Sequence, residues 1–226
     1  MDREPTGEDF IDFKCPHCGS LNSFSTSAAN CVHECINCLD LLIVPAQDGE
    51  AARKLPFPIE APRLRLRPFE PTDWQDLLEF QFEDEDEATG WIPTTSTIRT
   101  GDMRGPFYLA VELLETNKVV GSLGFTFLDP ELNQVELSLT SKTPASLPGL
   151  ELEVFEAALD FCFQEMNLHR VITRCGADDS EQRELFKSLG MRQEAEFRKH
   201  QHIGGQWLST AYFAILEEEY FSEQSS

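Results

Sequence analysis

The chain has 226 residues, 41% of them hydrophobic, and a formal net charge of -22 at pH 7. A chain of this size can bury one sizeable core and a small accessory module, so we expect two domains. The acidic excess disfavours binding to nucleic acid or to an anionic membrane and favours a cationic partner, although it could also serve solubility alone.

No apolar run reaches the roughly 18 residues that a membrane-spanning helix requires. The first residues, Met1–Asp9, are acidic, whereas a secretory signal begins with a positively charged region. We therefore expect a cytoplasmic protein without membrane partners, and we interpret residues 1–10 as an acidic tail.

Cysteines are concentrated near the N-terminus, where five of the seven lie between residues 15 and 38. Two CxxC pairs stand out: Cys15 with Cys18, and Cys35 with Cys38. Four thiolates presented from two tight turns can complete a closed tetrahedral Zn²⁺ site. The spacing predicts a zinc ribbon over residues 11–45 with a structural Zn²⁺. A redox dithiol or unused cysteines are the alternatives.

The surplus candidate ligands Cys31, His17 and His33 are interpreted as bystanders. Lys14 is the one basic residue between positions 10 and 40. A ribbon with so little positive charge is a poor match for nucleic acid, so we expect a structural module or one that contacts protein.

Residues 46–61 contain several glycine, alanine and proline residues and are expected to form a semi-rigid linker. Beyond it, Leu64 and Leu66 alternate with arginines, which predicts a first strand. A helix is expected from Trp74. The acidic run Glu83–Glu87 is interpreted as a solvated loop, or alternatively as a collar that recruits an amine.

The remaining pattern predicts an α/β domain over residues 62–220, followed by a tail at 221–226. Three strands are expected as an antiparallel meander, at Phe107–Leu114, Val119–Phe127 and Gln134–Leu139. A helix opened by Gly149 follows, then a strand at Arg170–Arg174, a helix at Ser180–Leu189 that ends at Gly190, and a final hairpin that turns at Gly204-Gly205. A strand followed by a glycine and a helix also aims backbone N–H groups at a phosphate.

Six short motifs stand out in this region: Arg63-Leu64-Arg65-Leu66-Arg67-Pro68, Val120-Gly121-Ser122-Leu123-Gly124, Leu168-His169-Arg170-Val171, Leu189-Gly190-Met191, Glu194-Ala195-Glu196-Phe197-Arg198 and Gly205-Gln206-Trp207. Together they resemble the GNAT acetyltransferase superfamily, particularly the branch that acetylates the N-termini of ribosomal proteins. The resemblance implies the GNAT fold, which is a mixed, mostly antiparallel sheet with helices on both faces. It also implies an acetyl-CoA site where the last meander strand diverges from the strand after the central helix.

The resemblance places the pyrophosphate loop on Ser146–Glu151, where only Gly149 matches the family pattern. Pro148 has no N–H to donate, and Glu151 places a carboxylate where the phosphates would lie. The backbone of Leu139, Thr140 and Ser141 would hold the pantetheine arm. The family's asparagine and serine on the next helix fall on Asp179 and Gln182.

The resemblance aligns Glu136 with an acidic position that serves in some family members as general base for the amine. A strand glutamate without a role is the alternative. Phe186 occupies the position where many members have a tyrosine as general acid, so Tyr212 or a water would have to replace it.

Two functions remain open at this stage. The first is an acetyl-CoA-dependent N-acetyltransferase that acts on an amine, such as a peptide or protein N-terminus or a polyamine. The second is a domain that has lost its chemistry and works, with its zinc ribbon, as an interaction or regulatory protein, for example with a basic protein partner. The loop Ser146–Glu151 separates them, because a loop that cannot hold the diphosphate favours the second.

Overall fold

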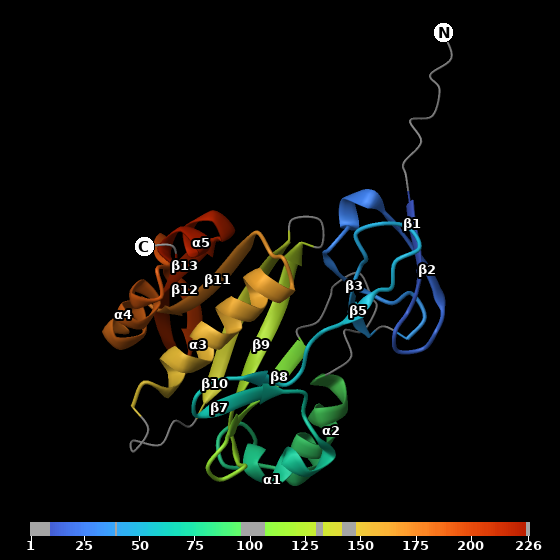
Figure 1. The fold of residues 1–226 in the computed structure, drawn as a ribbon. Helices are drawn as coiled ribbons and strands as arrows, with labels where there is room; N and C mark the ends of the chain where they lie inside the picture. The colour runs from blue at the N-terminus through green and yellow to red at the C-terminus, as the bar shows by residue number, and fades with distance from the viewer. Residues whose placement is uncertain (1–9, 39, 96–106, 130–132, 142–147, 225–226) are drawn as a thin grey trace.

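The computed structural model describes residues 10–38, 40–95, 107–129, 133–141 and 148–224 (Figure 1). A large sheet carries helices on both faces, and a small N-terminal module of short strands lies beside one end of it. Among the described residues, no helix is both long and apolar enough to cross a membrane.

The large sheet has eight strands in the order β12-β13-β11-β10-β9-β8-β7-β6. Its strands are β6 (Ile59–Glu60), β7 (Leu64–Arg67), β8 (Phe107–Leu113), β9 (Val119–Asp129), β10 (Gln134–Ser141), β11 (Arg170–Gly176), β12 (Arg192–Ile203) and β13 (Gln206–Leu216). The pair β10 and β11 is parallel, and the other neighbouring pairs are antiparallel. The expected mixed, mostly antiparallel GNAT fold is therefore confirmed.

Helices cover the two faces of this sheet (Figure 1). They are α1 (Trp74–Leu77), α2 (Glu85–Thr95), α3 (Leu150–Asp160), α4 (Ser180–Ser188) and α5 (Glu217–Gln224), and a π-helical turn (Phe161–Glu165) extends α3. On one face, Phe186 of α4 packs between Phe155 of α3 and Phe213 of β13, with ring centroids 5.3 and 5.4 Å apart. On the other face, Trp91 of α2 packs 4.9 Å from Tyr108 of β8.

The N-terminal module consists of a hairpin and a three-stranded sheet. Its strands are β1 (Phe10–Lys14), β2 (Leu21–Ser25), β3 (Val32–Glu34), β4 (Leu41–Ile43) and β5 (Arg53–Lys54). Successive side chains of β4 point to opposite faces, so Leu42 enters the module's own core while Ile43 joins the core of the large sheet. The module is thus packed onto the domain that follows it.

The segment 46–61, expected as a linker, contains β5 and β6. Strand β6 pairs with β7 and extends the large sheet, and Leu55 and Phe57 pack against its core. Burial of these apolar side chains explains why the segment takes a defined path despite its prolines.

The acidic run was expected to be a loop, and from Glu85 onward this is wrong, because α2 begins there. Carboxylates in the first turn of a helix are favoured by its dipole, so the acidic run suits a helix start. The predicted tail at residues 221–226 overlaps α5, which ends at Gln224.

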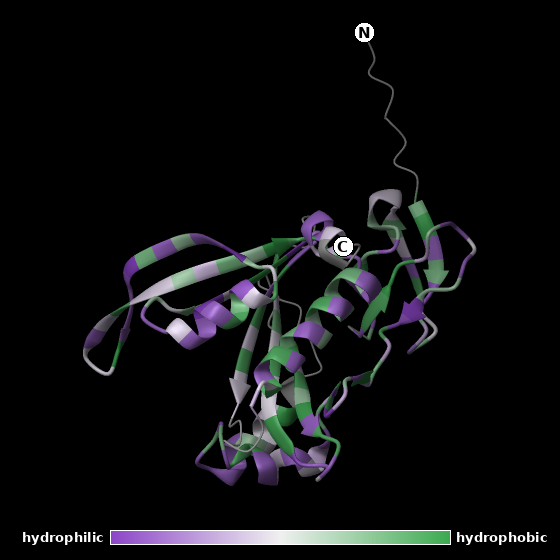
Figure 2. Cartoon of the chain, turned by 60° about the vertical axis from the view of Figure 1, so that its left-hand side comes forward, coloured by the Kyte–Doolittle hydropathy of each residue, from purple (hydrophilic) through white to green (hydrophobic). Residues whose placement is uncertain are grey.

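The predicted turn glycines lie where the backbone requires them. Gly190 follows α4 with a φ of 77°, and Gly204 and Gly205 turn the last hairpin with φ values of 57° and 81°. That hairpin extends away from the body of the molecule (Figure 2). Its strand β12 reaches Ile203, directly before the turn.

Candidate functional site

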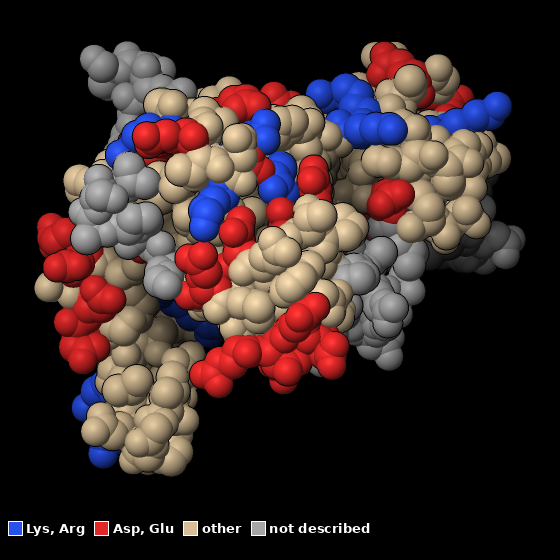
Figure 3. Space-filling model, turned by 90° about the horizontal axis from the view of Figure 1, so that it is seen from below, with Lys and Arg blue, Asp and Glu red and all other residues tan. Residues whose placement is uncertain are grey.

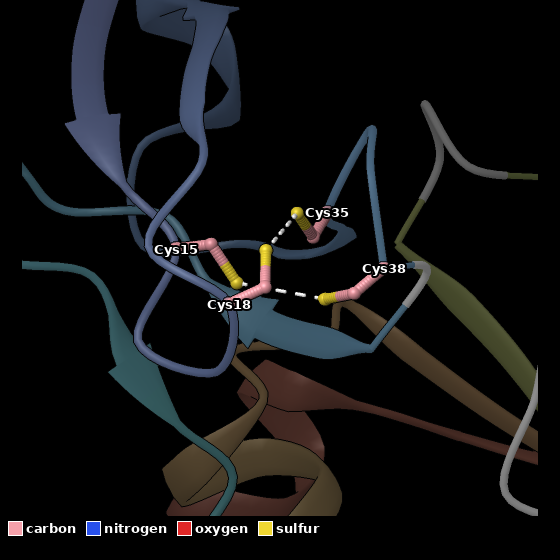
Figure 4. Close-up of side chains that lie close together, drawn as sticks. All are labelled: Cys15, Cys18, Cys35 and Cys38. Carbon is pink, nitrogen blue, oxygen red and sulfur yellow. Dashed lines mark hydrogen bonds between the residues drawn. The ribbon is translucent and has the colours of Figure 1, made fainter.

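The first candidate site is the cysteine cluster, formed by Cys15, Cys18, Cys35 and Cys38. Their four Sγ atoms lie within 4.8 Å of one another and point toward a common centre (Figure 4). The two cross-knuckle pairs, Cys15 with Cys38 and Cys18 with Cys35, have Sγ atoms 3.7 Å apart. In a tetrahedron with Zn–S bonds of about 2.3 Å, neighbouring sulfurs are about 3.8 Å apart. The cluster therefore fits a four-thiolate metal site.

Hydrogen bonds around the cluster favour thiolates. The Ser20 hydroxyl, 3.2 Å from Cys18 Sγ, lowers the pKa of that thiol to about 6. For Cys35 the pKa is also lowered, because backbone groups of Cys38 and Asn37 outweigh the opposing effect of burial. The Asn22 amide donates to Cys35 Sγ at 3.6 Å. Burial raises the pKa of Cys38, so a bound cation would be needed to hold that sulfur as a thiolate.

The surplus residues of the module lie outside this set of four sulfurs. Cys31 is buried, and its Sγ accepts a hydrogen bond from the Asn133 amide at 3.4 Å, just before β10. His17 places its Nε2 3.2 Å from the Leu41 carbonyl oxygen, and the His33 ring packs against Phe24. Cys31 thus links the module to the strand that carries Glu136.

The second candidate site is a groove that begins where β10 and β11 separate. We call it the donor groove, because the family resemblance implies that the acetyl donor, acetyl-CoA, would bind there. The parallel pairing of β10 and β11 ends at Glu136 and Ile172, although both strands continue, to Ser141 and Gly176. Just beyond the last pair, the Thr173 hydroxyl donates to the Leu137 carbonyl oxygen at 3.1 Å. The strands diverge as the family resemblance implies, and the backbone of Leu139–Ser141 borders the opening.

Glu136 lies at the apex of this opening, on the face opposite to α3. Its carboxylate Oε1 is 2.7 Å from Arg174 Nε, and its side chain is 14% exposed. Arg174 in turn places Nη1 3.4 Å from the Tyr212 hydroxyl on β13. A carboxylate, a guanidinium and a phenol therefore form a chain across the end of the opening.

The far end of the donor groove is a hollow of about 390 Å³ between the N-termini of α3 and α4. Gly149 caps α3 with a φ of 76°, and the side chains that line the hollow include Glu151, Asp179 and Glu181. The described lining residues include no lysine or arginine. Acidic side chains gather on the face seen from below, which is hollowed between them (Figure 3).

The carboxylate of Glu151 bridges the groove. It accepts a hydrogen bond from the Ser141 hydroxyl at 3.1 Å and one from the Gln182 amide at 3.2 Å. Asp179 caps α4 by accepting from the Gln182 N–H at 3.0 Å. Asp179 and Gln182, which align with the family's pantetheine contacts, thus have other partners: Asp179 caps α4, and Gln182 donates to Glu151.

Two further parts of the family pattern are the position of the tyrosine, here Phe186, and the pyrophosphate loop. Phe186 is 1% exposed, so it is a core residue. Ser146 and Leu147 of the expected pyrophosphate loop lie outside the described residues. Of that loop the structure describes Pro148, Gly149 and the start of α3, and the Pro148 carbonyl accepts from Arg63 Nη1 at 3.2 Å.

Sequence reasoning missed Arg174 and Tyr108. Arg174 reaches Glu136 only because β10 and β11 are parallel with Glu136 opposite Ile172, a register that the sequence does not reveal. The sequence offered one signal for Tyr108. A glycine within a strand, such as Gly124, often marks the close approach of another group, and here that group is the Tyr108 ring.

Comparisons with known proteins agree with this geometry. The family model described as Acetyltransferase (GNAT) domain matches residues 63–192. A Bacillus subtilis protein described as uncharacterized N-acetyltransferase YnaD is 29% identical over 174 residues, which cover 72% of this chain and 98% of that protein.

Solved structures give the same result for the fold. A GNAT-family acetyltransferase from Bacillus anthracis has a TM-score of 0.59 and 25% identity, and the match covers 72% of this chain and 99% of that one. The spermidine/spermine N-acetyltransferase SpeG from Vibrio cholerae has a TM-score of 0.60 at 18% identity, over 71% of this chain and 96% of that one. Because the family model covers more than half of the residues, the chain belongs to the GNAT acetyltransferase family.

Proposed function

We propose that this protein transfers an acetyl group from acetyl-CoA to a primary amine, with Glu136 as the general base. The observation that carries the proposal is the position of Glu136 at the apex where β10 and β11 separate. A carboxylate there can meet an amine on one face of the sheet while an extended donor lies between the strands. Family membership supports the same class of reaction.

The groove fits the two ends of acetyl-CoA unequally. Acetyl-CoA would supply the activated thioester, and the backbone of Leu139, Thr140 and Ser141 would hold its pantetheine arm as an added strand. The N–H groups of the first turn of α3, preceded by Gly149, suit a diphosphate. The Glu151 carboxylate opposes it, so the phosphate end of the site is weak.

Glu136 would take the proton from the substrate ammonium. Its Oε1 lies 2.7 Å from Arg174 Nε, and the carboxylate would accept the proton and free the nitrogen lone pair for attack. A positioned base of this kind contributes typically about 10²–10⁴-fold to the rate.

Phe186 cannot protonate the departing thiolate, because it has no acidic proton. Tyr212 is our candidate for this role, since its hydroxyl lies near Arg174 on the same face as Glu136.

We also propose that the cysteine cluster binds a structural Zn²⁺. The spacing of its four sulfurs supports this, and a closed four-thiolate site leaves no position for a catalytic water. The metal would supply the folding free energy that the small core of the module lacks.

The test of the reaction is Glu136→Gln in zinc-loaded protein, assayed with acetyl-CoA and a panel of peptide and polyamine acceptors. We expect kcat to fall by about 10²–10⁴-fold with little change in the donor KM. Glu194→Gln is the matched control, because Glu194 is also a strand glutamate paired with an arginine of β11, Arg170. Wild-type turnover by Glu136→Gln would exclude Glu136 as the base.

The second candidate function is an interaction or regulatory protein without acetyl transfer. The observation that favours it is the Glu151 bridge across the donor groove. Calorimetric titration with acetyl-CoA, with CoA as the control, decides between the two. A dissociation constant in the micromolar range, about -8 kcal/mol, supports the enzyme, and no binding at millimolar ligand supports the alternative.

A further inference from the structure

The edge of β10 that faces the donor groove offers uncharged backbone groups. The Leu137 carbonyl points toward β11, because the Thr173 hydroxyl donates to it at 3.1 Å. Successive residues of a strand direct their backbone groups to alternate sides, so the N–H and C=O groups of Leu139 point the same way. Pairing with β11 has already ended at Glu136. An extended chain that contains amide groups can add to such an edge as a further strand.

The hollow at the far end of the groove is acidic. It measures about 390 Å³, and the carboxylates of Glu151, Asp179 and Glu181 line it. Among the described lining residues, none carries a positive charge. Phosphate groups bind most strongly where arginine, lysine or N–H donors meet them. The side-chain charges of this hollow instead have the same sign as those of a diphosphate.

The starts of the two helices are also occupied by the chain itself. The Asp179 carboxylate accepts from the Gln182 N–H at 3.0 Å, and the Asp179 carbonyl accepts from the Arg183 N–H at 3.2 Å. At the start of α3, the Glu151 carboxylate is fixed by hydrogen bonds from Ser141 and Gln182. The Glu151 bridge therefore places a fixed negative charge where the edge of β10 meets the hollow.

One arginine lies near this end of the groove, but it has other partners. A Cβ at Gly149 would be 3.9 Å from Arg63 Nη2. Arg63 Nε is 2.7 Å from Oε2 of the buried Glu153, and Nη1 donates to the Pro148 carbonyl at 3.2 Å. A diphosphate would have to break this buried charge pair to recruit the guanidinium, which is costly.

We propose that the donor groove accepts nucleotide-free acetyl thioesters of pantetheine at least as well as acetyl-CoA. The proposal rests on the function proposed above and specifies its donor. Pantetheine is uncharged and contains two amide groups, which suit the backbone edge at Leu139. The nucleotide of CoA adds phosphates, which are repelled by Glu151 and by the net charge of -22 of the whole chain. The affinity for the donor therefore comes from the pantetheine arm.

The chemistry is the same with the shorter donor. The amine nitrogen forms a C–N bond to the acetyl carbonyl carbon, and the C–S bond breaks. An ammonium loses two protons on becoming an amide, of which one leaves through Glu136 and one goes to the departing sulfur. Acetyl-pantetheine and an ammonium thus give an acetylated amine, pantetheine thiol and one proton.

The test compares three ligands by calorimetry in zinc-loaded protein without an acceptor. They are acetyl-pantetheine, acetyl-CoA and the nucleotide part of CoA, 3′-phospho-ADP. We expect acetyl-pantetheine to have a dissociation constant equal to or below that of acetyl-CoA, and we expect no binding of 3′-phospho-ADP. A site built for phosphates would instead lose about 10- to 100-fold in affinity for each charge-assisted hydrogen bond that leaves with the nucleotide. Acetyl transfer from both donors is measured separately.

Glu151→Gln and Glu156→Gln are matched variants, because each removes one carboxylate from α3 and Glu156 is exposed. We expect Glu151→Gln to tighten acetyl-CoA about two- to fivefold and to leave acetyl-pantetheine unchanged, and Glu156→Gln to change neither. Salt is a second readout, since it screens repulsion between like charges. Raising it from about 0.05 M to about 0.5 M should tighten the binding of acetyl-CoA but not that of acetyl-pantetheine.

The outcomes separate the donor from the reaction. Acetyl-CoA that binds about tenfold or more tightly than acetyl-pantetheine, with or without Mg²⁺, overturns the proposal and leaves acetyl transfer in place. Micromolar binding of 3′-phospho-ADP overturns it as well. Equal binding of both donors without transfer from either keeps the proposal for the groove and removes the acetyltransferase function. Binding of neither donor overturns both.

Discussion

The cysteine cluster and the donor groove each bring several side chains together, but they are assembled in different ways. The cluster takes its four sulfurs from two short turns, and each CxxC pair has its geometry fixed within four residues. The bridge across the donor groove takes Ser141 from β10, Glu151 from α3 and Gln182 from α4. A locally built site can be read from spacing alone, whereas the chemistry of the groove depends on which distant residues the fold brings together.

The largest expected effect is that of Cys35→Ser, which removes one sulfur of the cluster. A structural zinc contributes on the order of 10 kcal/mol to the folding of comparable small modules. Because Val32, Ile43 and Leu55 of the module pack into the core of the large sheet, we expect the whole chain to unfold at a lower temperature. Zinc content and thermal unfolding measure the effect, with Cys175→Ser as the control outside the cluster. Retention of one zinc per chain would contradict the assignment.

Glu153→Ala tests a carboxylate in the first turn of α3, the turn that also carries Glu151. Unlike Glu151, Glu153 is paired with an arginine. Glu153 is 8% exposed and accepts from the Arg63 N–H at 2.6 Å and from Arg63 Nε at 2.7 Å. Removing it leaves the guanidinium with its hydrogen bond to the Pro148 carbonyl but without a carboxylate, so we expect a loss of about 1.5–3 kcal/mol in denaturant unfolding, with no gain in donor affinity. Glu156→Ala, an exposed position on α3, should change stability little. Equal effects of the two substitutions would show that the Arg63 pair contributes nothing.

Asn133→Ala tests the connection between the two regions. Asn133 has a φ of 49°, and its side chain donates to Cys31 of the module. Asn117 has a φ of 53° in the turn between β8 and β9, so Asn117→Ala carries the same backbone strain without that contact. We expect Asn133→Ala to lose about 0.5–1.5 kcal/mol more than Asn117→Ala in chemical denaturation. Equal losses would mean that the contact with Cys31 does not stabilise the chain.

The smallest expected effect is that of Glu151→Gln on the donor groove. The carboxylate repels phosphates at the N-terminus of α3, an effect of roughly 0.3–1 kcal/mol, so its removal should tighten acetyl-CoA binding by about two- to fivefold. Calorimetry with Glu151→Gln and the control Glu156→Gln measures it. Unchanged affinity would mean that the Glu151 bridge does not restrict the site.

Much of the fold was predictable, because alternation and turn residues are local signals. The strand at Leu64–Arg67, the helix closed by Gly190 and the hairpin turned by Gly204 and Gly205 all follow from such signals. Strand β6 was missed, since the prolines on either side of it indicate a linker and its order comes from pairing with β7 of the large sheet. The start of α2 was missed because an acidic run is compatible with both a loop and a helix N-terminus.

The candidate sites were predictable to different degrees for the same reason. The four cysteines of the cluster were identified from spacing, and the structure places them together. Glu136 was identified only through family resemblance. The contact between Arg174 and Glu136 and the overlap of Tyr108 with Gly124 depend on sheet register, which no local pattern encodes.

The hairpin of β12 and β13 has a consequence for how the chain opens. The Ser209 carbonyl accepts from the Ala177 N–H at 2.9 Å, and β13 pairs with β11 from Thr210 onward, so Gln206–Leu208 are paired with β12 alone. A two-stranded ribbon is marginally stable in water, and Trp207 there is 60% exposed. The amide hydrogens of Gln206–Leu208 should therefore exchange with solvent faster than those of Thr210–Leu216. A protease could cut this end of the ribbon while the rest of the sheet stays folded.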